Sequence, residues 1–175
     1  MNNEQYNAMA PDLLCDHIEQ THHKYVENTS VEIKENLKQL IDNGADNKSN
    51  LIEVSTIFDE TASQLAMHMR REELMLFPVI RKMVKTQKPV KTLFGSIRKP
   101  IETMLDEHDS EEERFEKIAE LTDDYNTDNN NDKLYNTTLK MLKEFGEDLL
   151  LHIHLENDIL FPKSIELEDN LKKEE

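Results

Sequence analysis

The sequence predicts an all-α protein, an antiparallel bundle of four helices with up-down-up-down connections. Only 3 glycines and 5 prolines occur among the 175 residues, which leaves little material for β-turns. Apolar residues recur at steps of three and four along four long segments, which is the spacing of one helix face. Short polar stretches separate the segments, and short connections between long helices place neighbouring helices antiparallel.

Residues that start or stop helices set the expected boundaries. Pro11 suits a first helical turn, and Asp42-Asn43-Gly44 suits a helix end. The expected helices span about 11–41, 50–85, 96 or 100 to 125, and 132–167, with polar loops at 45–49 and 126–132. We expect one domain over 1–175, with the bundle at about 11–166 and a polar, frayed C-terminal tail over 168–175.

Composition excludes several classes of partner. The formal net charge is −16, whereas nucleic acids and anionic membranes are bound by clustered lysine and arginine. No apolar run approaches the ~18 residues needed to span a bilayer, and the first residues are too polar for a signal peptide. Cys15 is the one cysteine, so no internal disulfide can form. A cytoplasmic protein that binds neither nucleic acid nor membrane is therefore expected.

An internal repeat joins the second and fourth segments. His68-Met-Arg-Arg-Glu72-Glu-Leu-Met-Leu-Phe-Pro78 and His152-Ile-His-Leu-Glu156-Asn-Asp-Ile-Leu-Phe-Pro162 share five of eleven positions. The shared residues are the histidine, the glutamate and the Leu-Phe-Pro ending. The repeat suggests two related helical hairpins that pack together.

The repeated histidine and glutamate lie on the apolar faces of their helices. Residues four apart are neighbours on a helix, so His68 projects beside Glu72, and His152 beside Glu156. His154 lies about 200° around the helix from His152 and should face solvent. The predicted stripes are Val54, Ile57, Thr61, Leu65, His68, Glu72, Met75 and Val79 in segment two, and Leu134, Thr138, Met141, Phe145, Leu149, His152, Glu156 and Ile159 in segment four.

The other two segments each carry one more candidate. In segment three His108 is in mid-stripe; in segment one His22 and His23 flank the stripe, and periodicity does not choose between them. The predicted stripes are Ile101, Leu105, His108, Glu112, Phe115, Ala119 and Thr122 in segment three, and Cys15, Glu19, Val26, Ile33, Leu37 and Leu40 in segment one.

These histidines and glutamates all lie near the middle of their segments, so an antiparallel bundle brings them to one level. No lysine or arginine lies on the stripes within a turn of them, and carboxylates buried without a cation are costly. Imidazole with carboxylate in a bundle core favours iron or manganese over structural zinc. Two glutamates can bridge two metals, each also held by two histidines, with open positions left for O₂ or NO. An oxo or hydroxo bridge, or Glu112 as a further acid, would balance the charge, although Glu112 fits a solvated surface position equally well.

These motifs, together with Asp16-His17-Ile18, His22-His23, Pro100-Ile101 and Glu107-His108-Asp109, resemble the hemerythrin-like domain of the di-iron RIC proteins (repair of iron centres). The resemblance covers about 11–166. It implies two iron ions (Fe²⁺/Fe³⁺), with Glu72 and Glu156 as bridges. The family pattern places the first ligand two residues before Tyr25, which selects His23 and leaves His22 as a neighbour and optional extra ligand. The ligands so implied are His23, His68, Glu72, His108, His152 and Glu156.

The resemblance implies a function in repairing iron–sulfur clusters damaged by nitrosative or oxidative stress, with the protein acting as an iron donor rather than a turnover enzyme. Damaged iron–sulfur proteins would be its partners and iron acceptors. An O₂ or NO sensor or scavenger is the second interpretation, and a di-iron oxidase or NO reductase the third. Helix three has one histidine and helix four has Glu156, whereas oxygen-carrying hemerythrins have two histidines and an aspartate there. Many family members begin with a small Cys-Cys domain for which this chain has no room, so a partner would have to replace it. The oligomeric state stays open, with a homodimer as one alternative.

Overall fold

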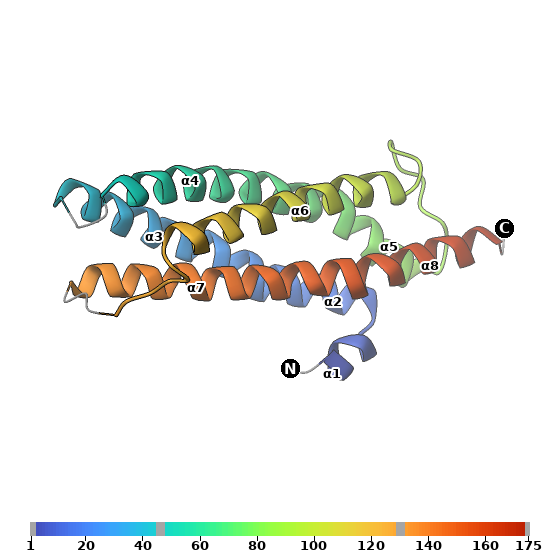
Figure 1. Ribbon diagram of the computed structural model, residues 1–175. Helices are drawn as coiled ribbons and strands as arrows, with labels where there is room; N and C mark the ends of the chain where they lie inside the picture. The colour runs from blue at the N-terminus through green and yellow to red at the C-terminus, as the bar shows by residue number, and fades with distance from the viewer. Residues whose placement is uncertain (1–2, 45–47, 129–131, 174–175) are drawn as a thin grey trace.

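The computed structural model describes residues 3–44, 48–128 and 132–173, and within these ranges the regular structure is helical throughout, without a strand. Figure 1 shows long helical rods lying side by side, which confirms the predicted all-α bundle. Within the same ranges, no helix is both long enough and apolar enough to cross a bilayer.

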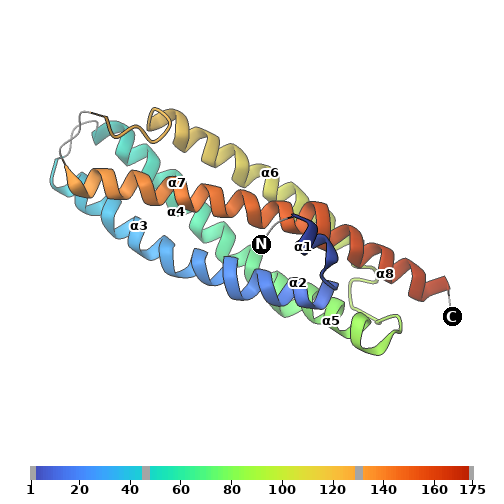
Figure 2. The same ribbon diagram turned by 90° about the horizontal axis from the view of Figure 1, so that it is seen from below.

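Each rod of the bundle can be followed along the chain in Figures 1 and 2. The first rod packs on the second and fourth, and the third rod packs on the second and fourth as well. A short helix, α1 (Asn3–Ala8), precedes the bundle and contacts the fourth rod. The rods are α2 (Pro11–Ile18), η1 (Glu19–His23) and α3 (Lys24–Asp42); α4 (Lys48–Arg71), η2 (Glu72–Leu76) and α5 (Phe77–Thr86); α6 (Arg98–Leu121); and α7 (Lys133–His154), η3 (Leu155–Leu160) and α8 (Phe161–Lys173), where η marks a π-helical turn.

The π turns explain where the predicted stripe of the second rod is wrong. A π turn holds one residue more than an α turn, so every later side chain is rotated around the axis. Met75 is 48% exposed, whereas Leu76 and Ile80 are fully buried in place of Met75 and Val79. Pro78 and Pro162 follow η2 and η3 at the second residue of the next α segment. Because proline lacks an N–H and its ring clashes with the carbonyl four residues back, an altered turn just before it is the expected accommodation.

The third rod has no π turn, yet its buried stripe also differs from the predicted one. Ile101, His108 and Phe115 are buried as expected, and they are spaced by seven residues. Between two buried residues that are seven apart, one further buried residue is expected either three or four positions after the first. The sequence does not distinguish these two positions. The structure buries Met104, Glu111 and Ile118 where Leu105, Glu112 and Ala119 were predicted.

The C-terminal ends of the third and fourth rods differ from the predicted ends. Helix α6 ends at Leu121 because Asp123, Asp124 and Tyr125 have φ values of 53°, 55° and 58°, which a right-handed helix cannot contain.

The expectation of a frayed tail is wrong as far as Lys173, because α8 continues to that residue and buries Leu171. The carboxylate of Glu168 accepts hydrogen bonds from Ser96 Oγ at 2.6 Å and from the Ile97 N–H at 3.2 Å, which ties α8 to the start of α6. Residues 174–175 lie outside the described part of the chain, as do 45–47 and 129–131 of the predicted loops.

Two apolar clusters fill the bundle on either side of a polar layer. One cluster includes Phe58, Phe115 and Phe145 and lies toward the end where α3 meets α4. The other includes Phe77 and Phe161 and lies toward α1, α5 and α8. The buried histidines and glutamates of the repeat lie between the two clusters, so the polar layer is sealed from both ends of the bundle by apolar side chains.

Gly146 lies in α7 where the ring of Phe115 packs against its backbone. A Cβ at this position would lie 2.8 Å from Phe115 Cδ1. Replacing a mid-helix glycine by alanine ordinarily stabilises by about 1 kcal/mol, but here the overlap forces a buried ring to move. We expect Gly146→Ala to lower the free energy of unfolding of the metal-free protein by about 1 kcal/mol, measured by urea denaturation. In a Phe115→Leu background the same substitution should be less harmful, and a stabilising effect in both backgrounds would contradict this packing.

Candidate metal centre

Six side chains from all four rods converge in the polar layer of the bundle, and each is at most 3% exposed. They are His23 at the end of η1, His68 in α4, Glu72 at the start of η2, His108 in α6, His152 in α7 and Glu156 in η3.

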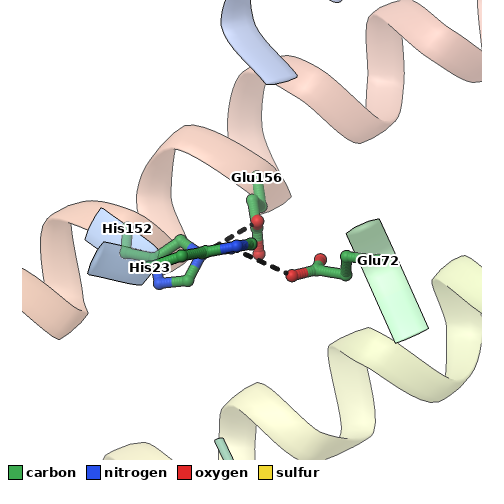
Figure 3. Close-up of side chains that lie close together, drawn as sticks. All are labelled: His23, Glu72, His152 and Glu156. Carbon is green, nitrogen blue, oxygen red and sulfur yellow. Dashed lines mark hydrogen bonds and ion pairs between the residues drawn. The ribbon is translucent and has the colours of Figure 1, made fainter. Parts of the chain in front are cut away.

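Each glutamate lies between two histidines. Glu156 Oε1 is 2.9 Å from His152 Nε2, and Glu156 Oε2 is 3.1 Å from His108 Nε2. Glu72 Oε2 is 3.4 Å from His23 Nε2 and 3.4 Å from His68 Nε2. Figure 3 shows Glu72 and Glu156 facing one another beside His23 and His152. Two sets of donor atoms, each within 4.8 Å, could hold metal ions: His23, Glu72, His152 and Glu156; and His68, His108 and Glu156.

The two sets are related by the internal repeat. Each set takes one histidine from the first helical hairpin and one from the second: His23 with His152, and His68 with His108. Exchanging the two hairpins exchanges the two pairs of histidines, whereas Glu156 belongs to both sets. A metal in either set would therefore join the hairpins through their shared core.

Three of the histidines are oriented by side chains for which the sequence predicted no role. His23 Nδ1–H donates to Glu73 at 2.7 Å, and His68 Nδ1–H donates to Glu107 at 2.8 Å. His108 Nδ1–H donates to Asn157 at 2.7 Å. With the proton held on Nδ1, the lone pair of Nε2 faces the interior, as in metal-binding histidines.

The sequence carried a signal for these orienting residues. Glu73 and Asn157 directly follow the two repeated glutamates, and Glu107 directly precedes His108. Neighbours on a helix point about 100° apart, so each can reach a ligand on the adjacent rod rather than on its own.

His152 differs from the other three histidines in its surroundings. Its Nδ1 is buried without a hydrogen-bond partner, and the ring of His22 stacks on it at 5.6 Å. His22 in turn hydrogen-bonds Asp148 through Nδ1 at 2.9 Å. His22 thus lies beside the converging set and not in it, while His154 turns outward as predicted, 36% exposed and hydrogen-bonded to Asp158.

The structure does not bring Glu112 to either set of donors. It lines a separate surface cavity with Phe115, Glu116 and Gly146. Its neighbour Glu111 is the buried acid, 3% exposed and paired with Arg114. Glu111 is buried because the buried face of α6 runs through positions three residues after Ile101, His108 and Phe115. The seven-residue spacing alone did not distinguish Glu111 from Glu112.

The two central glutamates place two negative charges in the core of the bundle. Both are fully buried, and no lysine or arginine of the described chain pairs with either of them. Burial raises the pKa of each carboxyl, but the surrounding imidazoles outweigh burial and hold the pKa of Glu72 below its usual range and that of Glu156 well below it. Both groups are therefore carboxylates that require positive charge beside them.

The contacts that lower the pKa of the glutamates raise the pKa of the histidines. Burial lowers the pKa of every one of them, but the carboxylates outweigh burial at His23 and His108 and raise the pKa, and at His68 they raise it well above its usual value. At His152 burial prevails and the pKa is lowered. Without a metal, protonated imidazoles supply the positive charge, so a bound metal would take the place of protons.

The donor atoms could hold metal. Both oxygens of Glu72, Oε2 of Glu156 and Nε2 of His23 are buried without hydrogen-bond partners, which a metal would provide. Oxygen and imidazole nitrogen are suitable ligands for iron, manganese or zinc. Cys15 is buried near the site, but burial raises the pKa of its thiol far above the usual value, so a thiolate is not part of the donor set.

Comparison with known proteins matches the chain to a cation-binding domain. The profile of the hemerythrin HHE cation binding domain matches residues 14–164. The chain is 31% identical over 114 residues to the iron-sulfur cluster repair protein DnrN of Neisseria gonorrhoeae, covering 65% of this chain and 67% of that protein. It is 36% identical over 101 residues to the iron-sulfur cluster repair protein YtfE of Dickeya chrysanthemi (strain Ech1591), covering 58% and 42%. It is 32% identical over 113 residues to YtfE of Yersinia pseudotuberculosis serotype IB (strain PB1/+), covering 65% and 45%. The matches thus span less than half the length of these two YtfE proteins.

The orientation of the two neighbouring histidines gives a direct test of the donor set. We expect His152→Ala to lose most of the bound metal, because its Nε2 faces Glu156. His154→Ala, two residues away on the outer face, is the matched control and should retain its metal. Metal analysis of the purified proteins checks this. Equal metal loss in both variants, or loss only in the control, would contradict the assignment.

The pKa shifts predict how pH acts on the metal-free and metal-loaded proteins. The raised pKa values of His23, His68 and His108 contribute stability that is complete below about pH 6.5 and is lost as pH rises through the folded-state pKa. The lowered pKa values of the glutamates contribute stability above about pH 4.5 that is lost as pH falls through theirs. His152, with its lowered pKa, opposes the other histidines. The chelated protein should therefore gain most from these groups between about pH 4.5 and 6.5.

Bound metal should change this profile, because ligand histidines must be neutral and the stabilisation by metal grows as pH rises. Thermal unfolding of chelated and loaded protein from about pH 5 to 8 measures both curves. Glu72→Leu combined with Glu156→Leu is the control, because it removes both carboxylates and leaves burial to lower the pKa of the histidines. Its metal-free form should be at least as stable near neutral pH, and it should gain rather than lose stability as pH rises through the histidine range. Identical curves with and without metal, after confirmed metal removal, would exclude a buried metal site here.

Proposed function

The chain belongs to the hemerythrin HHE cation binding domain family, and from that premise we propose that it is a di-iron protein that repairs damaged iron–sulfur clusters by donating iron. The observation that carries the proposal is the pair of buried glutamates, each lying between two histidines from different rods. Such a pair can hold two ions side by side with only two fixed negative charges. Relatives at 31% to 36% identity are named iron-sulfur cluster repair proteins, which supports this reaction class.

The residues divide between the two iron positions as the donor sets do. His23 and His152 would hold one iron, His68 and His108 would hold the other, and the carboxylates of Glu72 and Glu156 would bridge them. When bound, the iron pair supplies open coordination positions and access to two oxidation states. Glu73, Glu107 and Asn157 keep the imidazoles in the tautomer that binds metal.

A donor must hold iron firmly enough to protect it and loosely enough to release it. Four neutral imidazoles and two carboxylates, without thiolates, form a modest anionic set for two irons. The imidazoles take up protons readily beside the carboxylates, so protons can replace iron as it departs. Damaged iron–sulfur proteins, whose clusters have lost iron to NO or peroxide, are the acceptors in this proposal.

A second candidate function rests on a separate observation. A polar cavity of about 180 Å³ is lined by His68, which gives a small molecule a space beside one iron position. O₂ or NO would fit there, and tight reversible binding without iron loss would favour a sensor or scavenger over a donor.

Reactivation of a damaged enzyme tests the donor function. We expect iron-loaded protein, incubated anaerobically with a [4Fe–4S] dehydratase inactivated by NO or peroxide, to restore more activity than free ferrous iron at the same concentration. Glu156→Ala, which removes a bridge, should abolish the effect, and His154→Ala should preserve it. Recovery no better than with free iron would reject the donor function and favour the O₂ or NO alternative.

A further inference from the structure

We propose that the two iron positions are inequivalent and that the iron held by His68 and His108 is the one that is exchanged, through a cavity between α4 and α6. This inference rests on the proposed iron-donor function and adds which iron is given up and by which route.

The internal repeat allows the two positions to be compared residue by residue. His23 and His108 correspond, and each is covered alike: Phe77 stacks on His23 at 5.8 Å, and Phe161 stacks on His108 at 6.1 Å. These phenylalanines are themselves equivalent members of the repeat. On this side of the site, neither position is more accessible than the other.

The other pair of corresponding histidines, His68 and His152, is covered differently. The residue before His23 is His22, whose ring stacks on His152 at 5.6 Å and seals that side. The residue before His108 is Glu107, which accepts a hydrogen bond from His68 Nδ1 at 2.8 Å and lines a cavity together with His68. The difference between His22 and Glu107 at equivalent positions of the two hairpins thus places a ring over one metal position and a cavity beside the other.

The cavity reaches His68 from the surface. It holds about 180 Å³ and is lined by Gln64, His68, Glu107, Ser110, Glu111 and Arg114. Gln64 and Ser110 are exposed, whereas His68 and Glu111 are buried, so the lining runs from solvent to a ligand. A hydrated ferrous ion or a small chelating group would find room there.

The lining of the cavity suits the passage of a cation. Glu111 is 3% exposed, and while one of its oxygens pairs with Arg114, Oε2 is buried without a hydrogen-bond partner. Arg114 is 28% exposed and can swing into solvent, which would free the whole carboxylate to receive a metal. One turn before Glu111 on α6, Glu107 pairs with Arg71 of α4. Two carboxylates therefore follow His68 outward, each paired with an arginine that balances its charge in the absence of a cation.

The test is the kinetics of iron removal from the intact, iron-loaded protein. We expect an excess of a ferrous chelator to remove one equivalent rapidly and the second more slowly, by on the order of tenfold. Ser110→Phe and Gln64→Phe, at exposed positions lining the cavity, should slow the fast phase and leave the slow phase unchanged. Ser63→Phe, the exposed neighbour of Gln64 outside the lining, is the matched control and should change neither phase.

The identity of the iron that remains gives a second readout that does not depend on the variants. In crystals of protein trapped after the fast phase, anomalous scattering from iron should persist beside His23 and His152. Iron remaining beside His68 and His108, loss of both irons at one rate, or equal slowing by the control would overturn the inference. Two-phase release to the chelator without reactivation of the dehydratase would reject the donor function alone. Reactivation with single-phase release would reject the inequivalence alone.

Discussion

The structure depends on two carboxylates that are buried in the centre of a helical bundle, and no lysine or arginine of the described residues lies beside them. Glu72 and Glu156 lose their hydration on folding, and the cost of several kcal/mol per ion must be offset by positive charge placed next to them. Four imidazoles surround the pair, with three of them raised in pKa by the carboxylates. The same arrangement that favours protonation of these histidines in the metal-free protein offers donor atoms that could hold metal ions. Metal binding would therefore stabilise the packing of the two hairpins against one another.

The π turns place the ligands within this constraint. Three of the four rods contain one, and each turn holds or begins at a residue of the site: His23, Glu72 and Glu156. A wider turn lets a glutamate lean to the middle of the bundle while the following residue, Glu73 or Asn157, reaches the histidine of the preceding rod. Glu72 and Glu73 contact the two nitrogens of His23, and Glu156 and Asn157 contact the two nitrogens of His108. Each half of the repeat therefore supplies a central carboxylate and also orients a histidine of the preceding rod.

The sequence predicted the parts of the site that periodicity and repetition determine. The His-x-x-x-Glu pairs and His108 lie inside, as their stripes indicated, and the resemblance selected His23 over His22, which the structure places beside the converging set. The predicted buried stripe after Glu72 was wrong, because a π turn rotates the following side chains around the helix axis. Pro78 was the residue in the sequence that could have indicated this turn. The stripe of the third segment was predicted to include Glu112, but Glu111 is the buried residue. The prediction failed because positions three and four residues after His108 are equally compatible with an apolar repeat of seven. The prediction of a frayed C-terminal tail was wrong, because contacts of Glu168 and Leu171 with distant parts of the chain order the helix there. Local composition does not reveal such contacts.

The central claim is that Glu72 and Glu156 bridge two metal ions held by four histidines. Anomalous X-ray diffraction from crystals of the iron-loaded protein, recorded on both sides of the iron absorption edge, tests it most directly. The account predicts two iron peaks about 3.5–4 Å apart in the polar layer, one beside His23 and His152 and the other beside His68 and His108, with both glutamates between them. A single iron peak, or iron bound anywhere but between these two glutamates, would contradict it.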